Sequence, residues 1–277
     1  MFRYTTATAV REVLVWIFAL VSLLPFYFLV ITALKPDEEL LTTGNSVPPS
    51  RPTIENFTEV LSGGGDSNIL LALLHSAIIT LGSIAGLVAF GSLAAYVLAR
   101  TTARWGNVTY YLFLTAIILP TQLGLIPLYI GARQVGLVGS IWGMIILYVG
   151  TLMPLAVFLY AGFFRGLPRD YEEAAAIDGA SPARVFFRIV LPLMAPATGT
   201  VAILTGLIVW NDFFSALIFL GGSENQTLTV SMYYYVGSLV SAWNKIFAIV
   251  IISMVPILAF YLFAQKKFIQ GFAGGIK

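Results

Sequence analysis

The sequence contains no cysteine and a single histidine, and only 10% of its 277 residues are charged. The absence of cysteine excludes disulfides, thiol catalysis and cysteine-ligated metals. One histidine cannot form a histidine-rich metal site, and scattered carboxylates make a poor general acid–base pair. We therefore expect no catalytic residue and no metal site in this chain. A net charge of +2 gives no reason to expect nucleic acid as a partner.

Nucleotide-binding motifs are also missing from the sequence. It has no Gly-x-x-x-x-Gly-Lys-[Ser/Thr] phosphate loop and no Gly-Lys pair. The Gly-x-Ser-x-Gly elbow of serine hydrolases and the His-Glu-x-x-His pattern of zinc proteases do not occur either. We expect the chain to bind no cofactor, and any ATP that drives it must be hydrolysed by another subunit.

Apolar residues dominate what is present: 58% of the chain is hydrophobic and its mean hydropathy is +0.90. Because soluble domains carry about 25% charged residues, this composition indicates a polytopic membrane protein. A spanning helix needs about 20 mostly apolar residues. The sequence predicts an all-α fold in a single transmembrane domain over residues 1–277. Its six transmembrane helices are predicted at about Val13–Leu34, Ile69–Ala99, Val108–Ile130, Ser140–Phe164, Leu193–Leu220 and Ile246–Ala264.

Two of these predicted spans have features that bear on packing. Gly82 and Gly86 form a small-xxx-small pair in the second span, which favours close contact with another helix in lipid. Pro120 and Pro127 interrupt the third span, and the carbonyls that they free must be satisfied within protein or beside water. Bent helices around a pathway would meet that requirement, and so would kinked structural helices.

Lysines and arginines indicate the orientation, because they concentrate in cytoplasmic loops. With a cytoplasmic N-terminus, the outer segments hold only Lys35, Arg51, Arg133 and Lys245. The inner segments hold Arg3, Arg11, Arg100, Arg104, Arg165, Arg169, Arg184, Arg188, Lys266, Lys267 and Lys277. We therefore predict that both termini are cytoplasmic, that residues 35–68 form an extracytoplasmic loop and that residues 167–192 form a cytoplasmic one.

The loop at 167–192, between the fourth and fifth spans, concentrates charge in an otherwise apolar chain. Three acidic residues at its start suit a helix N-terminus, and the alanines that follow favour helix. Gly179 ends that helix, and Ser181 with Pro182 begins another, which Leu191-Pro192 then stops. Ala175 and Gly179 lie four residues apart, so we expect them to form one small-residue face that a partner's backbone can approach.

This loop resembles the signature of inner-membrane permease subunits of ATP-driven importers. The match consists of Glu173-Ala174-Ala175, three residues, Gly179, nine residues, Ile189, one residue and Leu191-Pro192. In that family the helix is called the coupling helix and lies in a groove of the ATPase subunit. The resemblance implies an ATPase-coupling site formed by Arg169, Asp170, Tyr171, Glu172, Glu173, Ala174, Ala175, Asp178 and Gly179.

Asp212 is the most notable charge in an apolar setting, and an ionisable group at membrane depth is a candidate functional residue. The segment Trp210-Asn211-Asp212-Phe213 combines polar groups for sugar hydroxyls with aromatic faces for a sugar ring, and it resembles the same position in sugar-importing permeases. These four residues are our predicted substrate pathway. Asp212 could instead pair with a neighbouring helix or cap a break in its own.

The Gly-rich tail after Lys266 and Lys267 is similar to the C-terminus of carbohydrate permeases, where it reaches toward the ATPases, and it could also be a frayed end. The resemblance implies a multi-pass subunit of a bacterial-type inner membrane, in contact with lipid. Its partners would be a second homologous permease, two ATP-binding-cassette ATPases that hold Mg-ATP, and an extracytoplasmic sugar-binding protein.

Three alternatives remain open. The chain could be an importer permease for another solute, such as peptides or phosphate. It could be an ion-coupled secondary transporter that uses Asp212 as its coupling site, or a membrane scaffold that transports nothing.

Overall fold

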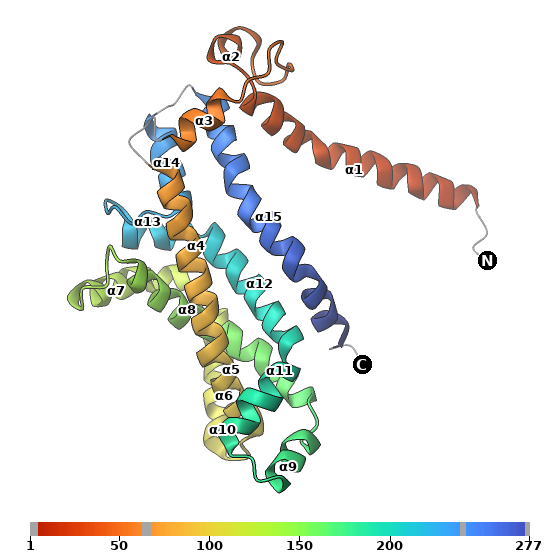
Figure 1. Ribbon diagram of the computed structural model, residues 1–277, viewed down its shortest axis with the longest axis vertical. Coiled ribbons are helices and arrows are strands. Elements are labelled where there is room, and N and C mark those ends of the chain that lie inside the picture. Colours follow the sequence, from red (N-terminus) through yellow and green to blue (C-terminus); the bar gives the residue numbers. More distant parts are fainter. Residues whose placement is uncertain (1–4, 63–67, 239–241, 275–277) are drawn as a thin grey trace. The chain divides into compact units, whose positions relative to one another are not determined.

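The computed structural model describes residues 5–62, 68–238 and 242–274, and every regular element in those ranges is helical. Figure 1 shows their course along the chain. The elements are α1 (Thr6–Ala33), α2 (Asp37–Thr43), α3 (Glu55–Leu61), α4 (Ile69–Gly86), η1 (Leu87–Gly91), α5 (Ser92–Arg100), α6 (Arg104–Ile118), α7 (Thr121–Gln134), α8 (Ile141–Gly166), α9 (Asp170–Ile177), α10 (Pro182–Val185), η2 (Phe186–Val190), α11 (Leu191–Leu193), α12 (Ala195–Asn211), α13 (Phe214–Leu220), α14 (Leu228–Ser238) and α15 (Trp243–Gly274).

Four stretches of helix are long and apolar enough to cross a membrane: Thr8–Ala33, Ile69–Arg100, Ile141–Gly166 and Trp243–Leu262. Two further helix pairs pass the same criterion together but bend sharply, so the number is six if each pair is one span. This confirms the predicted all-α polytopic class. The C-terminal segment differs from one of the two expectations for it. Helix α15 continues to Gly274, so the glycine-rich tail is helical over most of its length rather than frayed.

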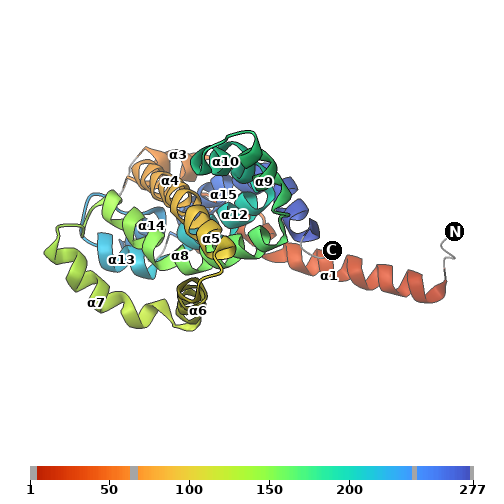
Figure 2. The ribbon, with the colours of Figure 1, turned by 90° about the horizontal axis from the view of Figure 1, so that it is seen from below.

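Both bent pairs turn within two residues of a proline. The third span breaks at Leu119-Pro120, where α6 and α7 differ in direction by 103°. Figure 2 shows these two helices running in different directions. The helix that begins at Pro182 continues to Leu193, one residue beyond the predicted stop at Leu191-Pro192, and the 72° bend follows at Met194.

The chain forms two compact units. The first comprises Met1–Leu70 and Ser231–Val255, and a polar cluster joins its segments. The Asn244 side-chain amide donates to the carbonyl oxygen of Lys35 (3.0 Å), to Asp37 Oδ1 (2.6 Å) and to Asn56 Oδ1 (2.9 Å). Lys245 Nζ lies 2.6 Å from Glu59 Oε1. These bonds order residues of the predicted outer loop, which contains the two short helices α2 and α3.

The second unit comprises Leu71–Val230 and Pro256–Lys277, and its core lies where α5, α6 and α12 pack on α8. The expected close approach at Gly82 and Gly86 is present, and the partner is α8. A Cβ added to Gly82 would lie 2.6 Å from Ile145 Cδ1, and one added to Gly86 would lie 2.6 Å from Val149 Cγ2. Glycine therefore lets two helix backbones approach at this seam.

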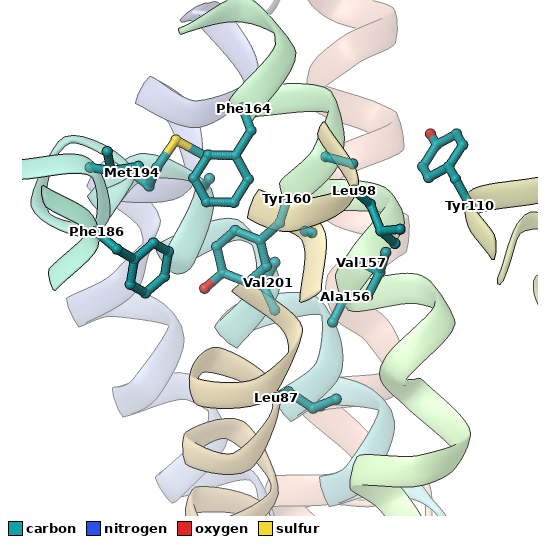
Figure 3. Close-up of a cluster of buried hydrophobic side chains, with 14 of the residues drawn as sticks. Leu87, Leu98, Tyr110, Ala156, Val157, Tyr160, Phe164, Phe186, Met194 and Val201 are labelled. Carbon is teal, nitrogen blue, oxygen red and sulfur yellow. The ribbon is translucent and has the colours of Figure 1, made fainter. Parts of the chain in front are cut away.

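Aromatic side chains close the end of this core that lies nearest α9. Figure 3 shows Tyr160, Phe164, Phe186 and Met194 gathered in one cluster. All four are buried, and the rings of Tyr160 and Phe164 are stacked with centroids 6.1 Å apart. The cluster gives the loop at 167–192 a rigid support, because close-packed aromatic rings leave little room for rearrangement.

Candidate functional site

The loop between α8 and α12 folds as the predicted pair of short helices with an elbow. Gly179 follows α9 with φ +77°, and its N–H donates to the Ala176 carbonyl oxygen (3.0 Å) while that of Ala180 donates to the Ala175 carbonyl oxygen (3.0 Å). This pair of bonds is the Schellman motif that ends helices at glycine. Ser181 then caps α10 by accepting from the Arg184 N–H at 3.4 Å. Local capping chemistry thus sets both ends of the elbow.

The expected small-residue face of α9 is not formed. The helix ends at Ile177, so Gly179 lies in the turn beyond it and not above Ala175 on a common face. Ala175 is 7% exposed and packs into the core of its own chain. A Cβ added at Gly179 would meet nothing within 4 Å. Within this chain, Gly179 is needed for its backbone conformation, because left-handed φ values disfavour residues with a Cβ.

The inward face of α9 is fastened to the end of α5 by charge. The Glu172 carboxylate accepts from Arg100, with Nε–Oε1 at 2.8 Å and Nη2–Oε1 at 2.6 Å, and its other oxygen accepts from the Tyr96 hydroxyl at 2.8 Å. Arg100 Nη2 also donates to the carbonyl oxygen of Leu167 at 3.0 Å, and Arg169 Nη2 donates to that of Arg100 at 3.3 Å. Both members of the ion pair are largely shielded, with side chains 15% and 17% exposed.

The outward face of α9 presents a mixed apolar and acidic surface. Tyr171 is 50% exposed and Ile177 is 87% exposed, and Glu173 and Ala174 are exposed beside them. Ile177 falls among the unspecified residues of the signature, so the sequence analysis did not single it out. The feature of the sequence that could have indicated Ile177 is an aliphatic residue at the end of an otherwise charged helix.

Asp212 lies at a break between α12 and α13 and is held there by the protein. One carboxylate oxygen accepts from the Tyr148 hydroxyl at 2.9 Å, and the other accepts from the Ser215 N–H at 3.4 Å. The carbonyl oxygen of Asp212 accepts from the Thr229 hydroxyl at 2.9 Å. The structure therefore shows the helix pairing and the capped break that were the alternative explanations for this charge.

A cleft of about 220 Å³ opens beside this break. Its lining mixes apolar side chains with seven polar side chains from α7, α8, α12, the break and α13: Thr121, Gln122, Tyr148, Thr151, Asn211, Asp212 and Ser215. The other two predicted pathway residues lie elsewhere. Trp210 lines a separate apolar cavity of about 150 Å³, together with Thr80 and Phe260. Phe213 packs edge-on against Phe214, with ring centroids 5.9 Å apart.

Within the residues that the structure describes, no three His, Asp or Glu side chains come together as metal ligands. The features that stand out are a capped, charged elbow at the end of the spans and a polar cleft within them. An all-helical, multi-span chain with these two features is a transport component of a membrane and contains no site of nucleotide chemistry in its sequence.

Residues 87–273 match the family model of the binding-protein-dependent transport system inner membrane component. The chain belongs to this family. It is 34% identical to the melibiose/raffinose/stachyose import permease protein MelC of Bacillus subtilis, with 98% of this chain and 97% of MelC aligned. It is 30% identical to the probable starch degradation products transport system permease protein AmyC of Thermoanaerobacterium thermosulfurigenes, with 94% of each chain aligned.

A solved structure with the same fold is a chain of a bacterial ABC transporter involved in the import of the acidic polysaccharide alginate. The TM-score is 0.83 at 22% identity, and the match covers 97% of this chain and 100% of the other. The predicted identity as a permease subunit of an importer is confirmed, and the ion-coupled alternative is not favoured. The chain is an inner-membrane component with several membrane-spanning helices.

Proposed function

We propose that this chain forms, with a second homologous permease, the inner-membrane pathway for a sugar or oligosaccharide. A pair of ATP-binding-cassette ATPases holding Mg-ATP works on its cytoplasmic side, and an extracytoplasmic sugar-binding protein delivers the substrate. The import of sugars by relatives such as MelC supports this substrate class. Both termini and the loop at 167–192 are cytoplasmic in this proposal, and residues 35–68 are extracytoplasmic.

The observation that carries the proposal is the two-sided character of α9. Its inward face is bound to α5 through Glu172, while Glu173, Ala174 and Ile177 stay exposed. A short rigid helix with one face free can occupy a groove on an ATPase. Closure of the ATPases would then favour one state of the pathway, because α9 makes different contacts in the two states. We add Ile177 to the nine proposed ATPase-coupling residues predicted from the sequence, which are Arg169, Asp170, Tyr171, Glu172, Glu173, Ala174, Ala175, Asp178 and Gly179.

The docking role of α9 is testable by replacing Ile177 with Asp. A buried carboxylate at this contact should prevent stable association, because interface anchors lose their partner contacts and acquire a desolvation penalty. The conservative variant Ile177→Val is the matched control and should behave as the wild type. Co-purification of the ATPase with the permease pair is the measurement. Undiminished co-purification and ATP hydrolysis with Ile177→Asp would exclude α9 as the docking element.

We propose further that the substrate passes the cleft lined by Asn211 and Asp212. The two amides, Gln122 and Asn211, and the hydroxyls in its wall suit the hydroxyl groups of a sugar. Adding melibiose, raffinose or maltodextrin with the cognate binding protein to the reconstituted assembly should identify the sugar by its stimulation of ATP hydrolysis. Asn211→Leu should lower sugar uptake while leaving assembly intact. If uptake is unchanged in this variant, the cleft is not on the path.

A further inference from the structure

Two consecutive glutamates of α9 face opposite environments. The Glu172 side chain is 17% exposed and bound to Arg100, whereas Glu173 is exposed on the other side of the helix. We infer that Glu172, although it belongs to the predicted coupling site, is a positioning residue which holds α9 against the spans, and that of the two glutamates only Glu173 is presented to the ATPase. This inference rests on the proposed docking of α9. We call Tyr96, Arg100 and Glu172 the latch.

The latch engages every polar group of Glu172 that could otherwise face a partner. Arg100 bonds one carboxylate oxygen through two nitrogens, and the Tyr96 hydroxyl bonds the other. Such charge-assisted bonds are short and strong, and shielding from solvent strengthens them further. An exposed ion pair would contribute little, so the low exposure of both side chains is what makes the latch effective.

The latch also joins α9 to more than one helix. Arg100 bonds the Leu167 carbonyl oxygen just after α8, which ties the end of that helix to α5. The Tyr96 ring packs edge-on against Phe164 of α8 at 5.6 Å and tilted against Phe186 of η2 at 5.1 Å. Movement of Glu172 is therefore transmitted to α5, α8 and η2 together.

The covalent connections of α9 cannot supply this rigidity. The helix has eight residues, and it is flanked by the extended Leu167 before it and by the Gly179 turn after it. Besides the latch, its inward contacts include Ala175, three residues after Glu172 and therefore on the same face, the packing of α9 on η2, and the bond from Arg169 to the Arg100 carbonyl oxygen. Without the latch, α9 could turn about its two ends, and force applied to it would not reach the spans.

A cysteine-free chain allows a direct test with spin labels. A nitroxide at Ala176→Cys, an exposed position of α9, reports how firmly the helix is held. In the full permease assembly, Glu172→Gln and Arg100→Gln should each raise the ratio of mobile to immobile label about tenfold, equivalent to about 1.4 kcal/mol. The double variant should be no worse than either single one, because both remove the same interaction. Arg104→Gln, at an exposed arginine nearby, is the matched control and should leave the ratio unchanged.

Transmission is measured with a second label at Val97→Cys on α5, which is 48% exposed. Trapping Mg-ATP with vanadate in the assembly should change the spectrum of this label in the wild type. With Glu172→Gln, the ATPases should still co-purify but this change should shrink about tenfold, again about 1.4 kcal/mol. Glu173→Gln should instead weaken co-purification itself.

The inference is overturned if Glu172→Gln leaves the Ala176 label as immobile as in the wild type. It is equally overturned if Glu172→Gln releases the ATPase as Glu173→Gln does, because Glu172 would then belong to the docking surface. Failure of the wild-type chain to retain any ATPase would refute the proposed function, and the Ala176 label would still decide whether the latch holds α9.

Discussion

Replacement of Gly179 separates two explanations for the glycine of the coupling loop. Its φ of +77° lies in the left-handed region, and an added Cβ would meet nothing within 4 Å. The objection to a side chain is therefore conformational within this chain. A left-handed residue with a Cβ costs about 1–2 kcal/mol, and asparagine tolerates this conformation better than other residues do. A change of one to two kcal/mol shifts an equilibrium by about 5- to 30-fold.

We therefore expect Gly179→Asn to retain more function than Gly179→Ala, although asparagine is larger. The assay is the amount of ATPase that co-purifies with the permease pair and the rate of ATP hydrolysis of the assembly. Gly166→Ala is the control, because Gly166 also has open space around its Cβ position but no positive φ. If the glycine were instead needed for space in the ATPase groove, alanine would be tolerated better than asparagine. That order would refute the conformational argument.

Three further substitutions test the packing of the chain by the thermal stability of the purified permease. Gly143→Ala should destabilise by about 1–3 kcal/mol, because its Cβ would lie 1.9 Å from a backbone carbonyl oxygen; Gly150→Ala in the same helix meets nothing and should be neutral or stabilising by about 0.5–1 kcal/mol. Equal stability of the two variants would contradict this difference. Asn244→Ala should cost about 1–3 kcal/mol by leaving the buried Asn56 Oδ1 without this donor, and an unchanged melting temperature would show that water replaces the amide. Tyr148→Phe removes the donor to the carboxylate at 212 and should destabilise by about 1.5–3 kcal/mol, the range for bonds to charged groups. A loss of uptake with no loss of stability would instead favour a direct role in the pathway.

The elbow of the coupling loop was predictable because its signals are local. The acidic first turn, the glycine at C′ and the Ser181-Pro182 start each act on a neighbouring backbone group, and the structure confirms both helices. The missed helix α2 had comparable signals, since Pro36 precedes three acidic residues at its start. The stop at Leu191-Pro192 was also a local signal, because proline cannot continue a helix, and the helix ends one residue later at Leu193.

Long-range partners could not be read from the sequence. Gly82 and Gly86 predicted a close helix contact, but only the fold shows that α8 provides it. The segment at 210–213 suggested one sugar site, yet Trp210 lines one cavity while Asn211 and Asp212 line another. Successive side chains of a helix point in different directions, so residues adjacent in sequence need not share a cavity.

Composition and local capping signals alone determined that this chain is a multi-span membrane protein with a charged helix between two spans, because hydrophobic length and helix capping depend on adjacent residues, and the resemblance of the signature indicated an importer subunit. Tertiary structure alone decided which of two neighbouring glutamates turns inward. Arg100 lies 72 residues before Glu172 in the chain, and no pattern near the glutamate specifies it. The physical reason is that burial of a carboxylate is costly unless hydrogen-bond donors replace water. The packing of α5 on α8 brings such donors to α9.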